Sequence, residues 1–159
     1  MKLMIVAMTL IISSFAQAAA RGDWVEFDYH RIEQSRNHVN GWHSRHILDQ
    51  QDQNYVIAEE YHLDGYAPNV SENTYNESQI LSDSMVQTWL KHCEYNRGTY
   101  ETIDVPAGTF ETCKVNLNEE NSNGWLWIGN VPLGVVKHEV TYVDGTSFSL
   151  ELSDYGHKK

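Results

Sequence analysis

The chain has 159 residues and carries 22 acidic side chains against 11 Lys and Arg, a formal net charge of −11. So acidic a chain is repelled by nucleic acid and by anionic lipid surfaces, and neither is expected as a partner. The length fits one domain that can bury a core without a metal ion or a dense set of disulfides.

The first twenty residues have the features of a secretory signal peptide. A basic Lys2 precedes the apolar run Leu3–Phe15, and small residues follow, so that cleavage is predicted after Ala18 or Ala20. The apolar run is short for a membrane span, and no later stretch is long and apolar enough for one. We therefore expect an exported protein, periplasmic or secreted, whose mature domain (residues 21–159) has no integral membrane segment.

The mature chain begins with a clear strand pattern. Apolar and polar residues alternate in Trp24–Ile32, as in a strand with one buried face. The Asn-Gly pair at 40–41 is a strong hairpin-turn signal and predicts a second strand over Trp42–Leu48. A third strand is predicted over Tyr55–Leu63, where Glu59 interrupts the apolar face and indicates an edge or rim of the sheet.

A loop and a helix are predicted next. Residues 64–78 are polar and contain Gly, Pro and several Asn, which is typical of a long surface loop. Ser82–His92 is predicted to be a helix with an N-terminal cap at Ser82 or Asp83. Its apolar residues form one stripe that can lie on the sheet: Met85, Val86, Trp89, Leu90 and Cys93.

The stretch from Tyr100 to Val115 predicts the central hairpin. Thr102–Val105 is rich in β-branched residues, and the Pro-Ala-Gly turn at 106–108 sends the chain back along a second strand. Cys113 and two apolar residues then alternate on one face of that strand.

The two cysteines of the sequence, Cys93 and Cys113, are predicted to form a disulfide, because an even count in an exported protein favours a bridge. Their spacing does not match a redox C-x-x-C motif, and two cysteines alone do not make a zinc site. A bridge closing roughly 20 residues stabilises the fold by about 3 kcal/mol in the chain-entropy description.

Further strands complete the chain at 125–128, at Val135–Tyr142 and, after an Asp-Gly turn, at 147–152. The predicted fold class is mainly β: a curved antiparallel sheet or half-barrel of about seven to eight strands, with one helix packed on it.

Aromatic side chains are the best candidates for a binding site. The candidate ligand-lining residues are Trp89, Trp125, Trp127 and Phe148. The alternative is that these aromatics fill the core and rim of a small barrel.

No catalytic or metal-binding motif is recognised in the sequence, so no catalytic residue, metal ligand or cofactor is assigned. His43 and His46 form the closest histidine pair, but residues three apart on a strand point to opposite faces and cannot chelate one ion alone.

Several runs together resemble a group of uncharacterised bacterial exported proteins. They are D-x-x-V-x-x-W-L-x-x-C (83–93), E-T-I-D-V-P-A-G-T-F-E-T-C-K-V (101–115) and W-L-W-I-G-N-V-P-L-G-V-V-K-H-E-V (125–140). That group is similar in architecture to the LolA/LolB-like lipoprotein carriers, in which a curved sheet wraps an apolar concave face. The resemblance implies a half-barrel and binding of a lipid, a lipoprotein or another apolar ligand.

The sequence therefore predicts a non-enzymatic, exported and monomeric protein that binds an apolar or amphipathic ligand or another envelope protein. The alternative prediction is a structural or interaction domain of the cell envelope with a filled core and no small ligand.

Overall fold

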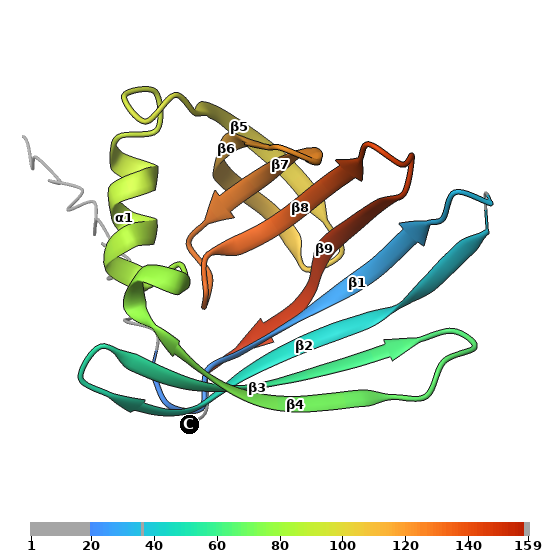
Figure 1. The fold of residues 1–159 in the computed structure, drawn as a ribbon. Coiled ribbons are helices and arrows are strands. Elements are labelled where there is room, and N and C mark those ends of the chain that lie inside the picture. The colour runs from blue at the N-terminus through green and yellow to red at the C-terminus, as the bar shows by residue number, and fades with distance from the viewer. Residues whose placement is uncertain (1–19, 36, 158–159) are drawn as a thin grey trace, which may run out of the picture.

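A computed structural model describes residues 20–35 and 37–157. The predicted signal peptide, residues 1–20, lies outside these residues except for Ala20. In the described part, the chain forms nine strands, one α-helix and one short 3-10 helix (Figure 1). Their bounds are β1 Trp24–Ile32, β2 His38–Gln51, β3 Asn54–Leu63, β4 Asn69–Asn76, η1 Glu77–Gln79, α1 Asp83–Lys91, β5 Thr99–Val105, β6 Gly108–Glu119, β7 Ser122–Gly129, β8 Val135–Tyr142 and β9 Ser147–Gly156.

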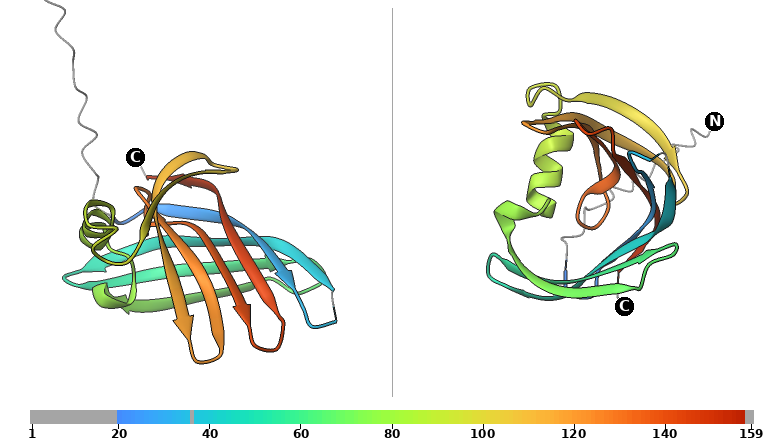
Figure 2. Two further views of the ribbon diagram at one scale, coloured as in Figure 1. Left: turned by 90° about the horizontal axis from the view of Figure 1, so that it is seen from above. Right: turned by 45° about the vertical axis from the view of Figure 1, so that its right-hand side comes forward.

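All strands belong to one antiparallel sheet with the order β4-β3-β2-β1-β9-β8-β7-β6-β5. The sheet is strongly curved and open, and the segment with η1 and α1 links its two edge strands, β4 and β5 (Figure 2). The mainly β, antiparallel fold with one helix is confirmed. The expected count of seven to eight strands is wrong, because the described residues form nine.

The additional strand, β4, lies in the segment expected to be a loop. It pairs with β3 from Asn54 opposite Asn76 to Tyr61 opposite Asn69. Most of its side chains are polar and exposed, and Val70 is its most exposed apolar residue. An edge strand of this kind is held by backbone hydrogen bonds rather than by a buried apolar face, so it has no hydrophobic alternation to detect.

The Asn-Gly pair at 40–41 is not a turn, and this prediction is wrong. Gly41 lies within β2, opposite Tyr29 of β1 and Leu63 of β3. A Cβ atom there would collide with the carbonyl of His62, so the glycine permits a close approach of two backbones. The chain reverses between Ile32 and His38 instead.

Two apolar clusters fill the inner side of the sheet. The larger one joins side chains of β1, β2, β3, β8 and β9, with Ile57, Leu152 and Val136 fully buried at its centre. The smaller one lies beneath α1, where Val86 packs against Ile128 and the disulfide. Of the predicted helix stripe, every residue except Met85 belongs to this smaller cluster.

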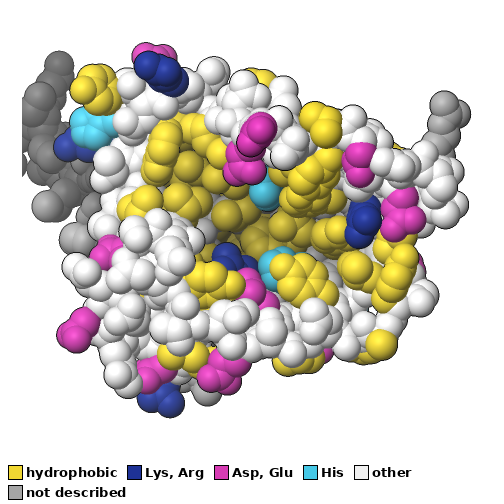
Figure 3. Space-filling model, viewed as in Figure 1, with side chains coloured by type: hydrophobic (Ala, Val, Ile, Leu, Met, Phe, Trp, Pro, Cys, Tyr) yellow, Lys and Arg dark blue, Asp and Glu magenta, His cyan; other side chains and the backbone are white. Residues whose placement is uncertain are grey.

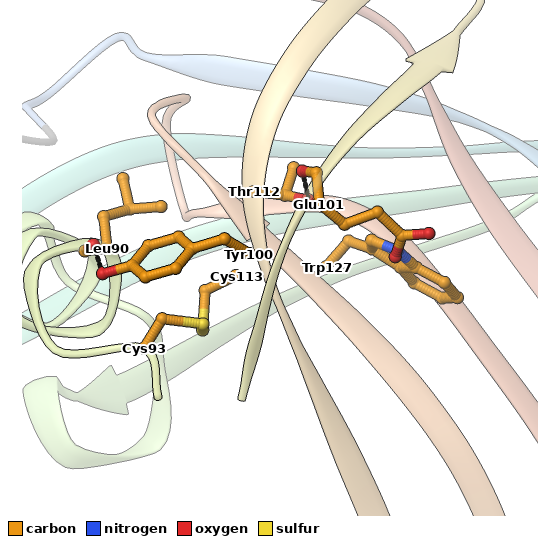
Figure 4. Close-up of a disulfide and its surroundings, with 7 residues drawn as sticks. All are labelled: Leu90, Cys93, Tyr100, Glu101, Thr112, Cys113 and Trp127. Atoms are coloured by element: carbon orange, nitrogen blue, oxygen red, sulfur yellow. Dashed lines mark hydrogen bonds between the residues drawn. A yellow bond between two sulfur atoms is a disulfide. The ribbon is translucent and has the colours of Figure 1, made fainter. Parts of the chain in front are cut away.

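The disulfide between Cys93 and Cys113 is present as predicted, and it joins the end of α1 to the β5–β6 hairpin, which lies at the edge of the sheet and not at its centre. Cys93 and Cys113 are fully buried and bonded at an S–S distance of 2.05 Å (Figure 4). The Tyr100 hydroxyl donates to the Leu90 carbonyl at 2.8 Å, a second link between the hairpin and the helix. A Cβ at Gly98 would overlap both sulfur atoms, so this position requires a glycine. The helix end is therefore fixed to the sheet.

In the described part of the chain, no helix has both the length and the apolar character needed to cross a membrane.

Candidate functional site

A hollow of about 620 Å³ lies on the inner face of the sheet, at the end away from α1 (Figure 3). Hydrophobic side chains gather inside it, and histidine and charged side chains lie among them. Strands β1, β3, β8 and β9 and the β8–β9 turn provide its walls. The lining residues are Tyr29, Arg31, Tyr61, His138, Tyr142, Asp144, Thr146, Phe148 and Leu150.

Strand register brings these side chains together from distant parts of the sequence. Tyr29 lies opposite Leu150, and Arg31 lies opposite Phe148 in the β1–β9 pair. His138 lies opposite Leu150 in the β8–β9 pair. Because alternate residues of a strand share a face, all five side chains project from the inner face into the hollow.

The walls are mainly aromatic. The Tyr29 and Phe148 rings stack with their centroids 6.2 Å apart. The His138 ring meets Phe148 edge to face at 5.3 Å. Burial lowers the pKa of His138 and raises the pKa of Tyr29. Neutral rings therefore line the hollow at neutral pH, a surface suited to an apolar ligand body.

His43 lies beside the hollow beneath Tyr61. Its ring stacks on Tyr61 with centroids 3.9 Å apart and an interplanar angle of 7°. The side chain is only 5% exposed, and neither ring nitrogen has a hydrogen-bond partner among the described groups. Burial, assisted by the charge of Arg45, lowers the pKa of His43 to about 4. The imidazole is thus neutral at physiological pH.

An ion pair lies on the inner face near Tyr61 of the hollow. Arg45 Nε lies 2.8 Å from Glu59 Oε1, although its N–H is not aligned for a hydrogen bond. The Tyr75 hydroxyl donates to Glu59 Oε2 at 2.8 Å. Glu59, for which an edge or rim of the sheet is expected, does not lie on an edge strand, since β3 is flanked by β2 and β4. Its charge is tolerated on the inner face because Arg45 of β2 pairs with it.

A second cleft, of about 450 Å³, lies between α1 and the sheet. Its lining includes Trp89 of the helix, Arg97 of the following loop, and apolar residues of β6 and β7. Trp89 also packs against the smaller apolar cluster. One predicted ligand-lining residue therefore lies in this cleft rather than in the hollow.

Phe148 is the predicted ligand-lining residue that lines the hollow. Side chains alternate between the two faces of β7, and Leu126 and Ile128 face α1. Trp125 and Trp127 therefore project from the opposite face of the sheet. Trp127 is 5% exposed because it lies under two lysines and donates to Glu101 Oε2 at 2.8 Å.

Trp125 is 41% exposed and lines a groove of about 490 Å³ on that opposite face. The Lys114 ammonium lies 4.9 Å from the centre of its ring. The four predicted residues therefore belong to different surfaces.

The closest histidine pair of the sequence does not come together in the fold. His43 is buried on the inner face, whereas His46 is exposed and stacks against Trp24 on the other face. Among the described residues, no group of three or more His, Cys, Asp or Glu side chains is arranged to hold a metal ion.

Several residues of the hollow carried no distinct sequence signal, among them Arg31, His138 and Asp144. The alternation along β1 was the available signal for Arg31, because this residue shares the inward face with Val25, Phe27 and Tyr29. Asp144 belongs to a predicted turn, and only the fold brings that turn beside the end of β1. No protein-family model matches the chain, and no curated protein matches it.

Proposed function

We propose that the protein is a non-enzymatic binding protein of the bacterial cell envelope, which holds an apolar or amphipathic ligand in the hollow. One observation carries this proposal: an aromatic-walled hollow of about 620 Å³ remains on the same sheet face that α1 covers at its other end. Sites for small apolar ligands are concave, largely apolar, and provided with a few polar groups.

The side chains around the hollow suit binding better than acid–base chemistry. The partly buried charges of Arg45 and Glu59 pair with each other, and the His43 and His138 rings pack against aromatic rings. A catalytic base must reach a proton of the substrate. His43 is stacked beneath Tyr61 and does not have that access.

The proposed ligand class is a lipid, a lipoprotein acyl group or a similar amphiphile. The resemblance to LolA/LolB-like carriers supports this class, as does the curved sheet with a helix across one end. The disulfide is compatible with an oxidising compartment, and the proposed location is the periplasm or the extracellular space.

Native mass spectrometry of the protein purified without detergent tests the proposal. We expect a bound molecule of defined mass that is lost on denaturation and is recovered in an organic extract. Phe148→Ala, within the hollow, should reduce its occupancy. The matched control Trp125→Ala, on the opposite face, should leave the occupancy unchanged.

The second candidate is an interaction domain of the envelope without a small ligand. The observation that favours it is the groove beside Trp125, where Tyr142 and Val143 are also exposed. A bare native mass, equal to that of the disulfide-bonded chain, would favour this candidate and would contradict ligand binding in the hollow.

A further inference from the structure

Two charges of opposite sign lie at the mouth of the hollow, and they bear on the kind of ligand that rests in it. Arg31 comes from the end of β1, and Asp144 comes from the β8–β9 turn. Both line the hollow, yet among the residues that the structure describes no ion pair joins them. The inference below rests on the proposed function, because it concerns the head group of a ligand bound in the same hollow.

The Arg31 guanidinium retains capacity to bind an anion. Its ion pair with Glu33 is a long contact of 3.5 Å from one terminal nitrogen, and its side chain also hydrogen-bonds the Tyr29 hydroxyl, whereas Nε is buried. A guanidinium has five N–H donors in a planar fork that matches a carboxylate or a phosphate. Its side chain is 41% exposed although Nε is buried, so an anion would bind to the terminal N–H groups of the guanidinium.

The Asp144 carboxylate is held in its ionised form. The backbone N–H of Thr146 donates to Asp144 Oδ1 at 2.8 Å. This hydrogen bond, together with side-chain hydrogen bonds from Thr146 and Gln34 and the charge of Arg31, lowers the pKa of Asp144 below its ordinary value. An ionised carboxylate therefore lies at the mouth at neutral pH, and the ring of Tyr142 lines the same side of the hollow. A carboxylate beside an aromatic ring is a favourable site for an ammonium group.

We propose that the ligand of the hollow is a zwitterionic amphiphile. Its anionic group binds Arg31, its cationic group binds Asp144, and its apolar body rests against Phe148 and Leu150. A purely anionic head would be attracted by Arg31 but repelled by Asp144 and by Glu33 beside it. A purely cationic head would be repelled by Arg31. Only a head with both charges complements both groups.

Binding of decyl amphiphiles, each below its micelle concentration, tests this proposal by isothermal titration calorimetry on the purified protein. Decylphosphocholine carries both charges, decyl sulfate only the negative one, decyltrimethylammonium only the positive one, and decyl maltoside none. We expect decylphosphocholine to bind about tenfold more tightly than each of the other three, a difference typical of one charge-assisted contact. Free tryptophan, also a zwitterion, distinguishes a soluble amino-acid-like ligand from a lipid.

Charge-removing variants then test the assignment of each group. Arg31→Gln should weaken decylphosphocholine binding about tenfold and leave decyltrimethylammonium as the preferred charged probe. Asp144→Asn should weaken it by a similar factor and leave decyl sulfate preferred. Arg97→Gln is the matched control, because Arg97 lines the cleft under α1, and it should change nothing. Circular dichroism verifies that each variant is folded.

The outcomes separate the two proposals. If no decyl probe and no tryptophan binds, ligand binding in the hollow is contradicted, and the zwitterionic head with it. If all decyl probes bind equally, the hollow binds apolar bodies, but the zwitterionic head is contradicted. The zwitterionic head is also contradicted if Arg31→Gln and Asp144→Asn both leave the preference among the decyl probes unchanged. Weaker probe binding by Arg97→Gln would place the ligand under α1 instead.

Discussion

The two ends of the inner sheet face are built from similar strands but are completed differently. At one end α1 covers the sheet, Val86 and Ile128 are fully buried, and the disulfide fixes the helix end. At the other end no helix covers the sheet in the described part of the chain, and partly exposed aromatic side chains surround the hollow.

It follows from this difference that the sheet alone does not specify a binding site. The helix α1 packs over β6 and β7 and leaves a cleft of about 450 Å³ there, whereas the surface that it does not cover has the aromatic rings of the hollow and the charges at its mouth. We therefore expect substitutions at the α1 end to change stability and substitutions at the open end to change binding.

The largest expected effect separates the two ends by stability. Ile128→Ala, beneath α1, should lower the free energy of unfolding by about 4 kcal/mol, because the cavity adds to the lost burial. Leu150→Ala, in the hollow, should lower it by only about 1 kcal/mol, since this side chain is half-buried. Urea unfolding followed by tryptophan fluorescence measures both values. Equal losses would contradict the distinction between the end that α1 covers and the open end.

Removing the disulfide should weaken the α1 end without affecting the hollow. Cys93→Ala combined with Cys113→Ala should lower the free energy of unfolding by about 3 kcal/mol, the value for a bridge that spans 20 residues. Ligand affinity of the folded variant should stay within about twofold of the native value, because the bridge lies far from the mouth. A large loss of affinity in the folded variant would show that the two ends are coupled.

Acid should destabilise the open end through His43. Because the pKa of His43 is about 4 in the folded protein and 6.5 in the unfolded chain, the unfolded state binds more protons between these values. The contribution of His43 to stability is thus complete above pH 6.5, falls as the pH decreases, and is reduced by about 2 kcal/mol at pH 5.

His43→Phe should remove this part of the pH dependence, as measured by urea unfolding between pH 7.5 and 4.5, a range chosen around the two values. The quantity to compare is the slope of the free energy of unfolding with pH. Its absolute value also changes, because the phenyl ring is larger than the imidazole. His46→Phe, three residues along β2 on the exposed face, is the matched control. A slope unchanged by His43→Phe would contradict the neutral, buried imidazole.

A small stability effect is also expected at the aromatic wall of the hollow. Phe148→Ala should lower the free energy of unfolding by about 1 kcal/mol, because its ring is half-buried. It should nevertheless reduce affinity for an apolar ligand about tenfold, since the ring forms one wall of the site. A variant that binds normally would indicate that the ligand lies elsewhere.

Much of the fold is predictable because its strands alternate clearly. The alternation predicts Trp24–Ile32 and Val135–Tyr142 with the bounds that the structure has, and cysteine number and setting predict the disulfide. β4 is not predictable, because a polar edge strand depends on the backbone of β3 rather than on its own sequence pattern. The Asn-Gly pair predicts a turn, although Gly41 serves a close approach within β2.

The site is less predictable for two physical reasons. In the run from Trp125 to Ile128 both alternating faces are apolar, so the pattern places the two tryptophans together but does not say which face turns inward. Arg31 and Asp144 are far apart in the chain, and only the order β1-β9-β8 brings them to one mouth. Charged residues that only the strand order brings together do not form a local sequence motif.

Amide hydrogen exchange with and without decylphosphocholine tests the central claim most directly, because it compares both ends of the sheet face in one experiment. Ligand in the hollow should slow exchange in residues 29–32 and 142–150 and leave Asp83–Lys91 unchanged. Slower exchange in α1, or no change at any position, would contradict the assignment of ligand binding to the open end.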